Sequence, residues 1–188
     1  MFTRMLIAAF LSIAAGTVSA QHPAPPVAPF AAAGTLQYAF TADDHADEMI
    51  IAAIDAAQRQ VLVQAYSLTH RRIADALIRA KNRGLEVAVI ADEEQSRASP
   101  AMIRELARAG VPLLFDAQHA AAHNKVIVID TGGTDCAVVT GSFNFTYAAQ
   151  HRNAENALIL RGNPPLCEAY FNNWRRHQLH SRAPAKSR

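Results

Sequence analysis

Apolar residues recur along this chain at two spacings, one typical of helices and one typical of strands. Helical spacing, with apolar residues three and four positions apart, is found over residues 47–58, 71–82, 100–110 and 166–178. Strand patterns cover residues 36–40, 61–68, 85–92, 111–115, 123–130, 136–144 and 155–160. Up to residue 115 the two kinds alternate, which predicts an α/β fold with a partly parallel sheet. Ser99 followed by Pro100 predicts the start of the third helix.

The first 34 residues differ in character from the rest of the chain. Arg4 precedes an apolar stretch over residues 6–15, and Val18 and Ala20 place small residues at positions −3 and −1 of a cleavage site. These features predict a secretory signal peptide over residues 1–20, with an uncleaved anchor helix as the alternative. Residues 21–34 are rich in proline and alanine and predict an extended linker. The protein is therefore expected in the periplasm or outside the cell, cleaved after Ala20.

The composition fits one packed domain, predicted over residues 35–181, with a basic tail over residues 182–188. Of the 188 residues, 51% are hydrophobic and 18% are charged, and the formal net charge is +2. These values exclude global disorder and a polybasic coat along the whole chain. No apolar run reaches the ~20 residues that a membrane span needs.

Charge is unevenly spread along the chain. Residues 1–150 hold 11 Lys/Arg and 14 Asp/Glu, whereas residues 151–188 hold seven and two. The basic C-terminal part is either a solvated helix or a surface that attracts a polyanion.

The two cysteines exclude a disulfide-rich scaffold and a four-cysteine zinc site. Cys136 and Cys167 lie in a chain with an export signal, and an oxidising compartment permits a disulfide. The sequence leaves both a disulfide and two buried thiols open.

A group of polar residues on two neighbouring predicted strands is the strongest candidate for chemistry. His123 and Lys125 are two positions apart, so their side chains point to one face of a strand. Ser142 and Asn144 have the same spacing at the end of the next strand, after Gly141. If the strands form a hairpin, these side chains converge. A histidine, a fixed cation and two neutral hydrogen-bonding groups suit a phosphodiester; an ordinary polar strand end is the alternative.

Two carboxylates accompany this group. Asp130 lies seven residues after His123, and the odd spacing points its side chain to the opposite face of the strand, which predicts a structural role in a turn or ion pair. Glu155 begins the next strand and is a candidate to orient the His123 ring. A surface glutamate on an edge strand is the alternative for Glu155.

These residues resemble the phospholipase D superfamily. HNKVIVID, residues 123–130, fits the pattern H-x-K-x4-D, and TGSFNF fits the G-S-x-N that follows it. The segments QAYSLT, AKNRGLEVAVIAD and NAENALIL extend the resemblance over residues 36–180 to the small, exported, single-motif bacterial endonucleases of this superfamily. The TGGTDC connection looks a few residues longer than in those endonucleases.

The resemblance implies an α/β/α sandwich with a mixed, partly parallel sheet, and phosphodiester hydrolysis without a metal or other cofactor. One histidine attacks phosphorus to give a phosphohistidine, a second histidine protonates the leaving alcohol, and water completes the reaction. The implied catalytic set is His123, Lys125, Asp130 and Glu155. The implied phosphate-binding set is Lys125, Ser142 and Asn144.

The resemblance also implies a homodimer. The mechanism needs two histidines, but the chain contains one H-x-K motif, and its other histidines lie outside any second copy. A two-fold symmetric dimer would bring one motif from each subunit to a shared site.

Three functions stay open at this stage. The short, single-motif chain with a basic end favours an endonuclease that cuts DNA, and RNA too, with little sequence preference. Hydrolysis of phospholipid headgroups uses the same motif. A non-catalytic nucleic-acid binder is the third possibility.

Other residues carry weaker hypotheses. A Mg2+ site is conceivable at two acidic groups, which are otherwise typical of helix caps or solvated loops. These groups comprise Asp43, Asp44, Asp92, Glu93 and Glu94. Aromatic residues could stack on bases, although core packing is the more common role. They comprise Phe143, Phe145, Tyr147 and Trp174, the last beside Arg175 and Arg176. His119 and His151 are expected at the surface.

Overall fold

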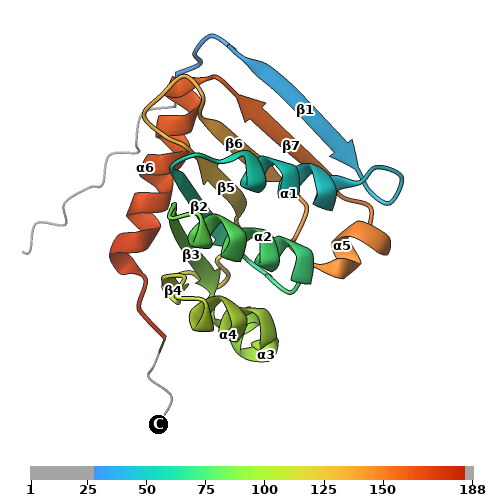
Figure 1. Cartoon of the computed structure of the whole chain (residues 1–188), viewed down its shortest axis with the longest axis vertical. Helices are drawn as coiled ribbons and strands as arrows, with labels where there is room; N and C mark the ends of the chain where they lie inside the picture. Colours follow the sequence, from blue (N-terminus) through green and yellow to red (C-terminus); the bar gives the residue numbers. More distant parts are fainter. Residues whose placement is uncertain (1–27, 185–188) are drawn as a thin grey trace, which may run out of the picture. The chain divides into compact units, whose positions relative to one another are not determined.

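A seven-stranded mixed sheet forms the centre of the structure (Figure 1). The strands are β1 (Thr35–Phe40), β2 (Gln60–Ala65), β3 (Glu86–Asp92), β4 (Leu113–Asp116), β5 (Lys125–Ile129), β6 (Ala137–Gly141) and β7 (Asn156–Arg161). Their order across the sheet is β1-β7-β6-β5-β2-β3-β4. Strands β2, β3 and β4 are parallel, and every other neighbouring pair is antiparallel.

The computed structural model describes residues 28–184. The predicted signal peptide and residues 21–27 of the predicted linker lie outside this range. The unit described below begins at Ala31. None of its helices combines the length and apolarity needed to cross a bilayer.

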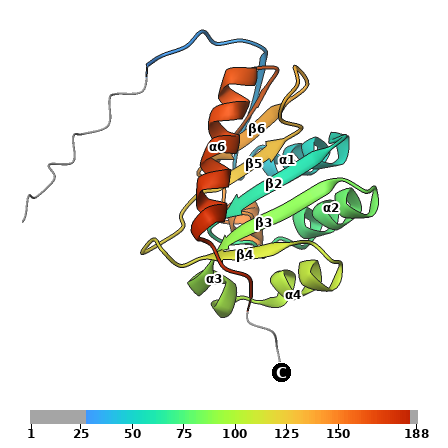
Figure 2. The same ribbon diagram turned by 90° about the vertical axis from the view of Figure 1, so that its left-hand side faces the viewer.

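Helices cover both faces of the sheet (Figure 2). They are α1 (Ala46–Ala56), α2 (Arg71–Asn82), α3 (Glu93–Ala98), α4 (Ala101–Arg108), α5 (Tyr147–His151) and α6 (Pro164–His180). Alternate residues of β2 face opposite layers, because side chains alternate along a strand. Val61 and Val63 join the larger core under α1, α2 and α4, whereas Leu62 packs with Trp174 of α6. This confirms the predicted α/β/α sandwich with a mixed sheet.

The local predictions differ from the structure mainly at helix and strand ends. The helix over residues 71–82 begins and ends as predicted, but α3 and α5 were not predicted. Both are too short to show an apolar repeat. Helix α3 instead starts because the Asp92 carboxylate accepts a hydrogen bond from the Gln95 amide. The prediction that Ser99 caps the next helix was wrong, because Ser99 ends α3 and Pro100 precedes α4 without a side-chain cap.

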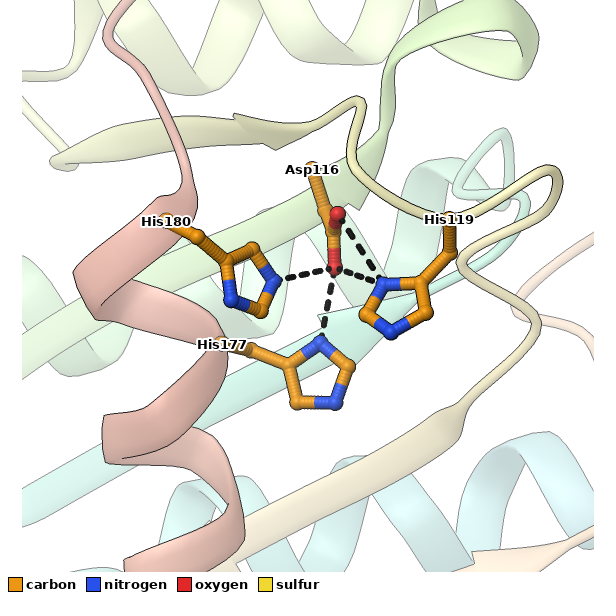
Figure 3. A group of neighbouring side chains, drawn as sticks. All are labelled: Asp116, His119, His177 and His180. Atoms are coloured by element: carbon orange, nitrogen blue, oxygen red, sulfur yellow. Dashed lines mark hydrogen bonds and ion pairs between the residues drawn. The ribbon is translucent and has the colours of Figure 1, made fainter. Parts of the chain in front are cut away.

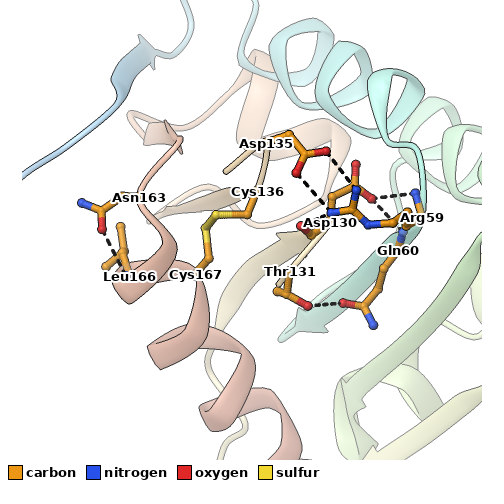
Figure 4. The surroundings of a disulfide bond; sticks show 9 residues. All are labelled: Arg59, Gln60, Asp130, Thr131, Asp135, Cys136, Asn163, Leu166 and Cys167. Atoms are coloured by element: carbon orange, nitrogen blue, oxygen red, sulfur yellow. Dashed lines mark hydrogen bonds and ion pairs between the residues drawn. A yellow bond between two sulfur atoms is a disulfide. The ribbon is translucent and has the colours of Figure 1, made fainter. Parts of the chain in front are cut away.

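Helix α6 is fixed to the sheet at both ends and in the middle. Near its C-terminus, His177 Nδ1 lies 2.7 Å from a carboxylate oxygen of Asp116, the last residue of β4 (Figure 3). In the middle, Trp174 Nε1 donates to the carbonyl oxygen of Val63 at 3.1 Å. Near its N-terminus, Cys167 forms a disulfide with Cys136, the residue before β6 (Figure 4). The structure thus resolves the question that the sequence left open in favour of a disulfide.

The Asp130 carboxylate organises the turn at the opposite end of β5 from His123 (Figure 4). Its oxygens accept the backbone N–H groups of Gln58, Arg59 and Gln60 at 2.7–2.8 Å. Asp130 itself has a positive φ of 50°, which aspartate tolerates better than most residues. The buried carboxylate therefore joins the start of β2 to the end of β5.

Asp130→Asn is expected to lower the free energy of unfolding by about 1–3 kcal/mol, because it places an amide N–H against a buried backbone donor. Urea unfolding followed by circular dichroism measures this change. Asp135→Asn is the matched control, since Asp135 is exposed and, within residues 28–184, its side chain pairs only with Arg59 on the surface. An equal effect of both substitutions would contradict the role given to Asp130.

Reduction of the Cys136–Cys167 disulfide is expected to lower the free energy of unfolding by about 3–4 kcal/mol. The bond closes a loop with a sequence separation of 31, and its loss enlarges the conformational entropy of the unfolded chain. Urea unfolding with and without reductant tests this, with the Cys136→Ala/Cys167→Ala variant as a reductant-insensitive control. Equal stability of oxidised and reduced protein would contradict it.

Candidate active site

The sheet brings the predicted site residues to the end at which β2 finishes and β5 begins. Ala65, the last residue of β2, pairs with Lys125, the first residue of β5. Continuing the observed register of β5 and β6, which pairs Ile127 with Val139, places Lys125 opposite Gly141. Gly141 in turn pairs with Ala157 of β7. Residues next to these positions, including His123, Ser142 and Glu155, are therefore neighbours in space.

His123 and Lys125 form a close pair. The Lys125 ammonium Nζ donates to the His123 carbonyl oxygen at 2.7 Å and lies 2.9 Å from His123 Nδ1. The His123 side chain is exposed in the loop before β5, whereas Lys125 is only 8% exposed. A histidine open to solvent thus lies against a cation held by the sheet.

The surroundings of Lys125 change the pKa of its ammonium group. Burial lowers the pKa of the Lys125 ammonium from its ordinary value, and the negative charge of Glu155 opposes that change. The ammonium also lies 5.0 Å from the ring centre of Tyr66, which offers a cation–π contact. Because these partners do not neutralise the cation by a direct ion pair, it is available to an anionic ligand.

Tyr66 was not predicted as a site residue. Its ring centre lies 4.4 Å from that of His123, and its backbone N–H donates to the Asn124 carbonyl oxygen at 2.9 Å. Tyr66 therefore fixes the position of both the ring and the backbone of the loop that carries His123. Its place directly after a buried strand, at the end where the motif residues meet, was the available sequence signal.

Ser142 and Glu155 form a second pair at the same end of the sheet. Ser142 Oγ donates to Glu155 Oε2 at 2.6 Å and accepts the Asn156 backbone N–H at 3.0 Å. Asn153 Nδ2 donates to the other carboxylate oxygen of Glu155 at 3.0 Å. Among the described residues, Glu155 makes no hydrogen bond to His123, so within this chain the carboxylate orients Ser142 and not the histidine.

Gly141 allows the backbones of β6 and β7 to approach closely at the site. Its φ is 145°, and a Cβ atom there would lie 2.3 Å from the Asn156 carbonyl oxygen. The neighbouring backbone occupies that space.

Asn144 completes the group from the segment after β6. Its side-chain oxygen Oδ1 is buried and has no hydrogen-bond partner in the described part of the chain. That oxygen is a hydrogen-bond acceptor and does not bind an anion, so the Nδ2 N–H groups of the same amide are the donors that could hold a phosphoryl oxygen. The flanking residues Phe143 and Phe145 are 2% and 1% exposed, so they anchor the segment in the core and do not face bases.

The remaining candidates lie elsewhere. Asp130 is at the far end of β5, as described above. Asp92 accepts the backbone N–H groups of Gln95 and Ala122, and Asp44 accepts that of Phe40, so both serve as turn and cap residues. Trp174 is buried as a packing anchor, and exposed Tyr147 contacts His151 with tilted rings whose centres are 4.1 Å apart.

Taken together, the arrangement offers a histidine nitrogen, a buried cation, a hydroxyl and an amide at one end of the sheet. Such groups neutralise and hold the oxygens of a tetrahedral anion, while the histidine can act as a nucleophile or as an acid–base group.

Known proteins resemble this chain in both sequence and fold. A family profile described as "Cardiolipin synthase, PLD-like domain" matches residues 50–177. A protein named phospholipase D from Rickettsia conorii is 38% identical over 135 residues, which cover 72% of this chain and 65% of the relative. A mitochondrial cardiolipin hydrolase from Xenopus tropicalis is 34% identical over 116 residues, or 62% of this chain and 53% of that protein. The chain thus spans less than two thirds of these relatives.

Solved structures agree with the sequence matches. The crystal structure of a phospholipase D family member, Nuc from Salmonella typhimurium, superposes with a TM-score of 0.76 at 34% identity, covering 82% of this chain and all of that one. NucT from Helicobacter pylori shares the fold, with a TM-score of 0.67 at 21% identity over 80% of this chain and all of that one. The H-x-K-x4-D residues, the mixed sheet that gathers them and these similarities lead to one conclusion: the chain belongs to the phospholipase D family.

Proposed function

We propose that this protein is a metal-independent phosphodiesterase that acts as a non-specific endonuclease on DNA and RNA. The observation that carries the proposal is the contact between exposed His123 and the buried ammonium of Lys125, 2.9 Å apart, at the sheet end where Ser142 and Asn144 also lie. The buried cation favours a ligand that brings negative charge.

The proposed reaction has two steps. A ring nitrogen of one His123 attacks phosphorus, so a nitrogen–phosphorus bond forms as the bond to the leaving alcohol oxygen breaks. A second histidine gives that oxygen its proton. Water then attacks phosphorus, loses its proton to the second histidine and displaces His123. Lys125 and Asn144 hold the phosphoryl oxygens, and Ser142, fixed by Glu155, assists them. Covalent catalysis of this kind divides one hard displacement into two easier ones.

A homodimer supplies the second histidine in this proposal. Within residues 28–184, no other histidine hydrogen-bonds to or stacks on His123. A surface suited to a second copy adjoins the site on edge strand β1, where Leu36, Tyr38 and Phe40 share one face and are 57–61% exposed. This apolar stripe reaches the site, because Phe40 pairs with Asn156 of β7 and the Thr41 N–H donates to the Glu155 carbonyl oxygen.

Charge near the site favours nucleic acid as the substrate. Helix α6 runs toward the end of the sheet that carries His123, and its C-terminal half exposes Arg175 and Arg176. Arg152, after α5, is exposed at the same end. None of the three forms an ion pair within the described chain, so they can meet backbone phosphates.

The names of the relatives favour the second candidate, hydrolysis of phospholipid headgroups. We further place the protein in the periplasm or outside the cell, which the disulfide supports.

Wild-type protein is expected to nick supercoiled plasmid in excess EDTA, and His123→Ala is expected to lose this activity by at least about 1,000-fold, because the nucleophile is gone. Agarose gels of the time courses measure both. His151→Ala, exposed and outside the site, is the control for a histidine substitution.

The other outcomes separate the alternatives. Nicking only after Mg2+ is restored would refute the metal-independent site. An intact plasmid together with headgroup release from phosphatidylcholine vesicles would replace the nuclease by the phospholipase. Retardation of DNA without cleavage, equal for wild type and His123→Ala, would leave a binding protein.

The shared site predicts a quadratic loss of activity in mixed dimers. When wild type and His123→Ala are co-expressed in equal amounts, about one quarter of the wild-type activity per chain is expected, because only dimers with two intact histidines are active. Differently tagged chains and mass photometry give the composition of the mixture. Activity of one half would show that each chain acts alone.

The buried ammonium predicts the alkaline limb of the pH profile. Because burial lowers the pKa of Lys125, rising pH removes the phosphate-binding charge earlier than for an exposed lysine, and kcat/KM should fall there. In Lys125→Arg the charge persists, so the limb is expected to move to higher pH on a lower overall rate. Lys81→Arg, on α2, is the control. An unmoved limb in Lys125→Arg would assign that limb to another group.

A further inference from the structure

A second cluster of chemically active side chains lies apart from the His123 pair. Asp116 ends β4, His119 follows in the loop to β5, and His177 and His180 lie on the last turns of α6. Figure 3 shows the three imidazole rings directed at the Asp116 carboxylate. One ligand atom from each residue lies within 4.8 Å of every other.

The three rings are arranged evenly around one carboxylate oxygen. Asp116 Oδ2 lies 2.7 Å from His177 Nδ1 and 3.1 Å from both His119 Nδ1 and His180 Nε2. The three ring centres are 5.0–5.3 Å apart. In a tetrahedral Zn2+ site with bonds of about 2.0–2.1 Å, two ligand atoms are separated by roughly 3.3 Å. The three distances from Asp116 Oδ2 to the imidazole nitrogens are close to this value.

Hydrogen bonds alone give an unfavourable account of this geometry. The N–H groups of His177 and His180 would have to converge on Oδ2, and that of His119, 3.1 Å from Oδ2 and 3.3 Å from Oδ1, would have to be shared between both oxygens. The same carboxylate already accepts the Gln118 backbone N–H at 3.0 Å. The Asp116 side chain is fully buried, so the three rings enclose a carboxylate that solvent does not reach.

We propose that Asp116, His119, His177 and His180 bind one divalent transition-metal ion, with Zn2+ as the preferred ion. Three imidazoles and one carboxylate suit zinc, whereas magnesium and calcium prefer oxygen ligands throughout. The exposed fraction of the side chains rises from 0% for Asp116 through 15% for His177 and 25% for His180 to 45% for His119. A cavity of about 420 Å³, lined by Asp116 and His119, gives an ion access from solvent.

The ion would have a structural role, because four protein ligands leave no open position for a substrate. It would join the end of β4 and the following loop to the C-terminal end of α6. Beside it, Phe115 and Arg182 already exchange two backbone hydrogen bonds. The loop continues to His123, but residues 122–124 have their own anchors, since Ala122 donates to Asp92 and Asn124 accepts from Tyr66. Loss of the ion should therefore lower stability and leave the rate of cleavage within a few-fold.

The spacing of these residues is a sequence signal that lies outside the H-x-K-x4-D motif. Asp116 and His119, in DAQH, are three positions apart, and so are His177 and His180, in HQLH. Each pair alone is unremarkable, and only the packing of α6 against β4 brings the two together.

Metal content and metal-dependent stability of the purified full-length gene product test this site. Mass spectrometry of the metals after dialysis should give about one zinc per chain in the wild type. The apoprotein should take up one Co2+ with the visible absorption bands of four-coordinate cobalt. Added Zn2+ should raise the Tm of the apoprotein by about 5 °C or more.

Variants assign the ligands. His119→Ala, in an exposed loop, and His177→Ala should each weaken Zn2+ binding by at least about 100-fold and abolish the Tm shift. His151→Ala and His123→Ala should keep both, which makes the result independent of the proposed catalytic mechanism. Circular dichroism confirms that each variant is folded. A wild-type chain that holds no zinc, gives no four-coordinate cobalt spectrum and shows no Tm shift would overturn the proposal, as would unchanged binding in His119→Ala and His177→Ala.

Discussion

Burial of the Lys125 ammonium is the constraint around which the rest of the proposed site is arranged. A cation that is 8% exposed is costly unless other groups stabilise it. Here its partners are the His123 carbonyl oxygen, the His123 and Tyr66 rings and the negative charge of Glu155. These partners keep the ammonium in place without neutralising it by a direct ion pair. A bound phosphodiester would provide the missing negative charge. Burial is unfavourable for the unpaired ammonium of the free protein, and it therefore favours binding of an anionic substrate.

The fold meets this constraint by placing an antiparallel strand, β5, between β2 and β6. The start of β5 then faces the end of β2, which supplies Tyr66, and the end of β6, which supplies Ser142. Asp130 fixes the other end of β5 through three backbone amides, so the position of Lys125 along the sheet is set from both ends. Helix α6 covers the face of the sheet opposite to α1, α2 and α4. Its disulfide, Trp174 and His177 attach it to three different strands.

The sequence predicted what depends on local periodicity and on a dense motif. Helix 71–82 was predicted to the residue, and the hairpin on which the convergence of His123/Lys125 and Ser142/Asn144 depended is present, because β5 and β6 pair. The odd spacing of Asp130 from His123 agrees with its place in the turn at the far end of β5. Features that depend on distant packing were not predictable. The Cys136–Cys167 bond, the Ser142–Glu155 pair and the Asp116 cluster join segments that no pattern in the chain relates to each other.

The central claim is that His123 forms a covalent bond to phosphorus, and a trapping experiment tests it most directly. A labelled oligonucleotide is mixed with the protein in EDTA and quenched with neutral detergent during turnover. The account predicts a covalent protein–DNA complex that acid destroys, that mass spectrometry maps to His123 and that His123→Ala lacks. Cleavage that proceeds in EDTA without such a complex, or a complex that persists in His123→Ala, would contradict the account.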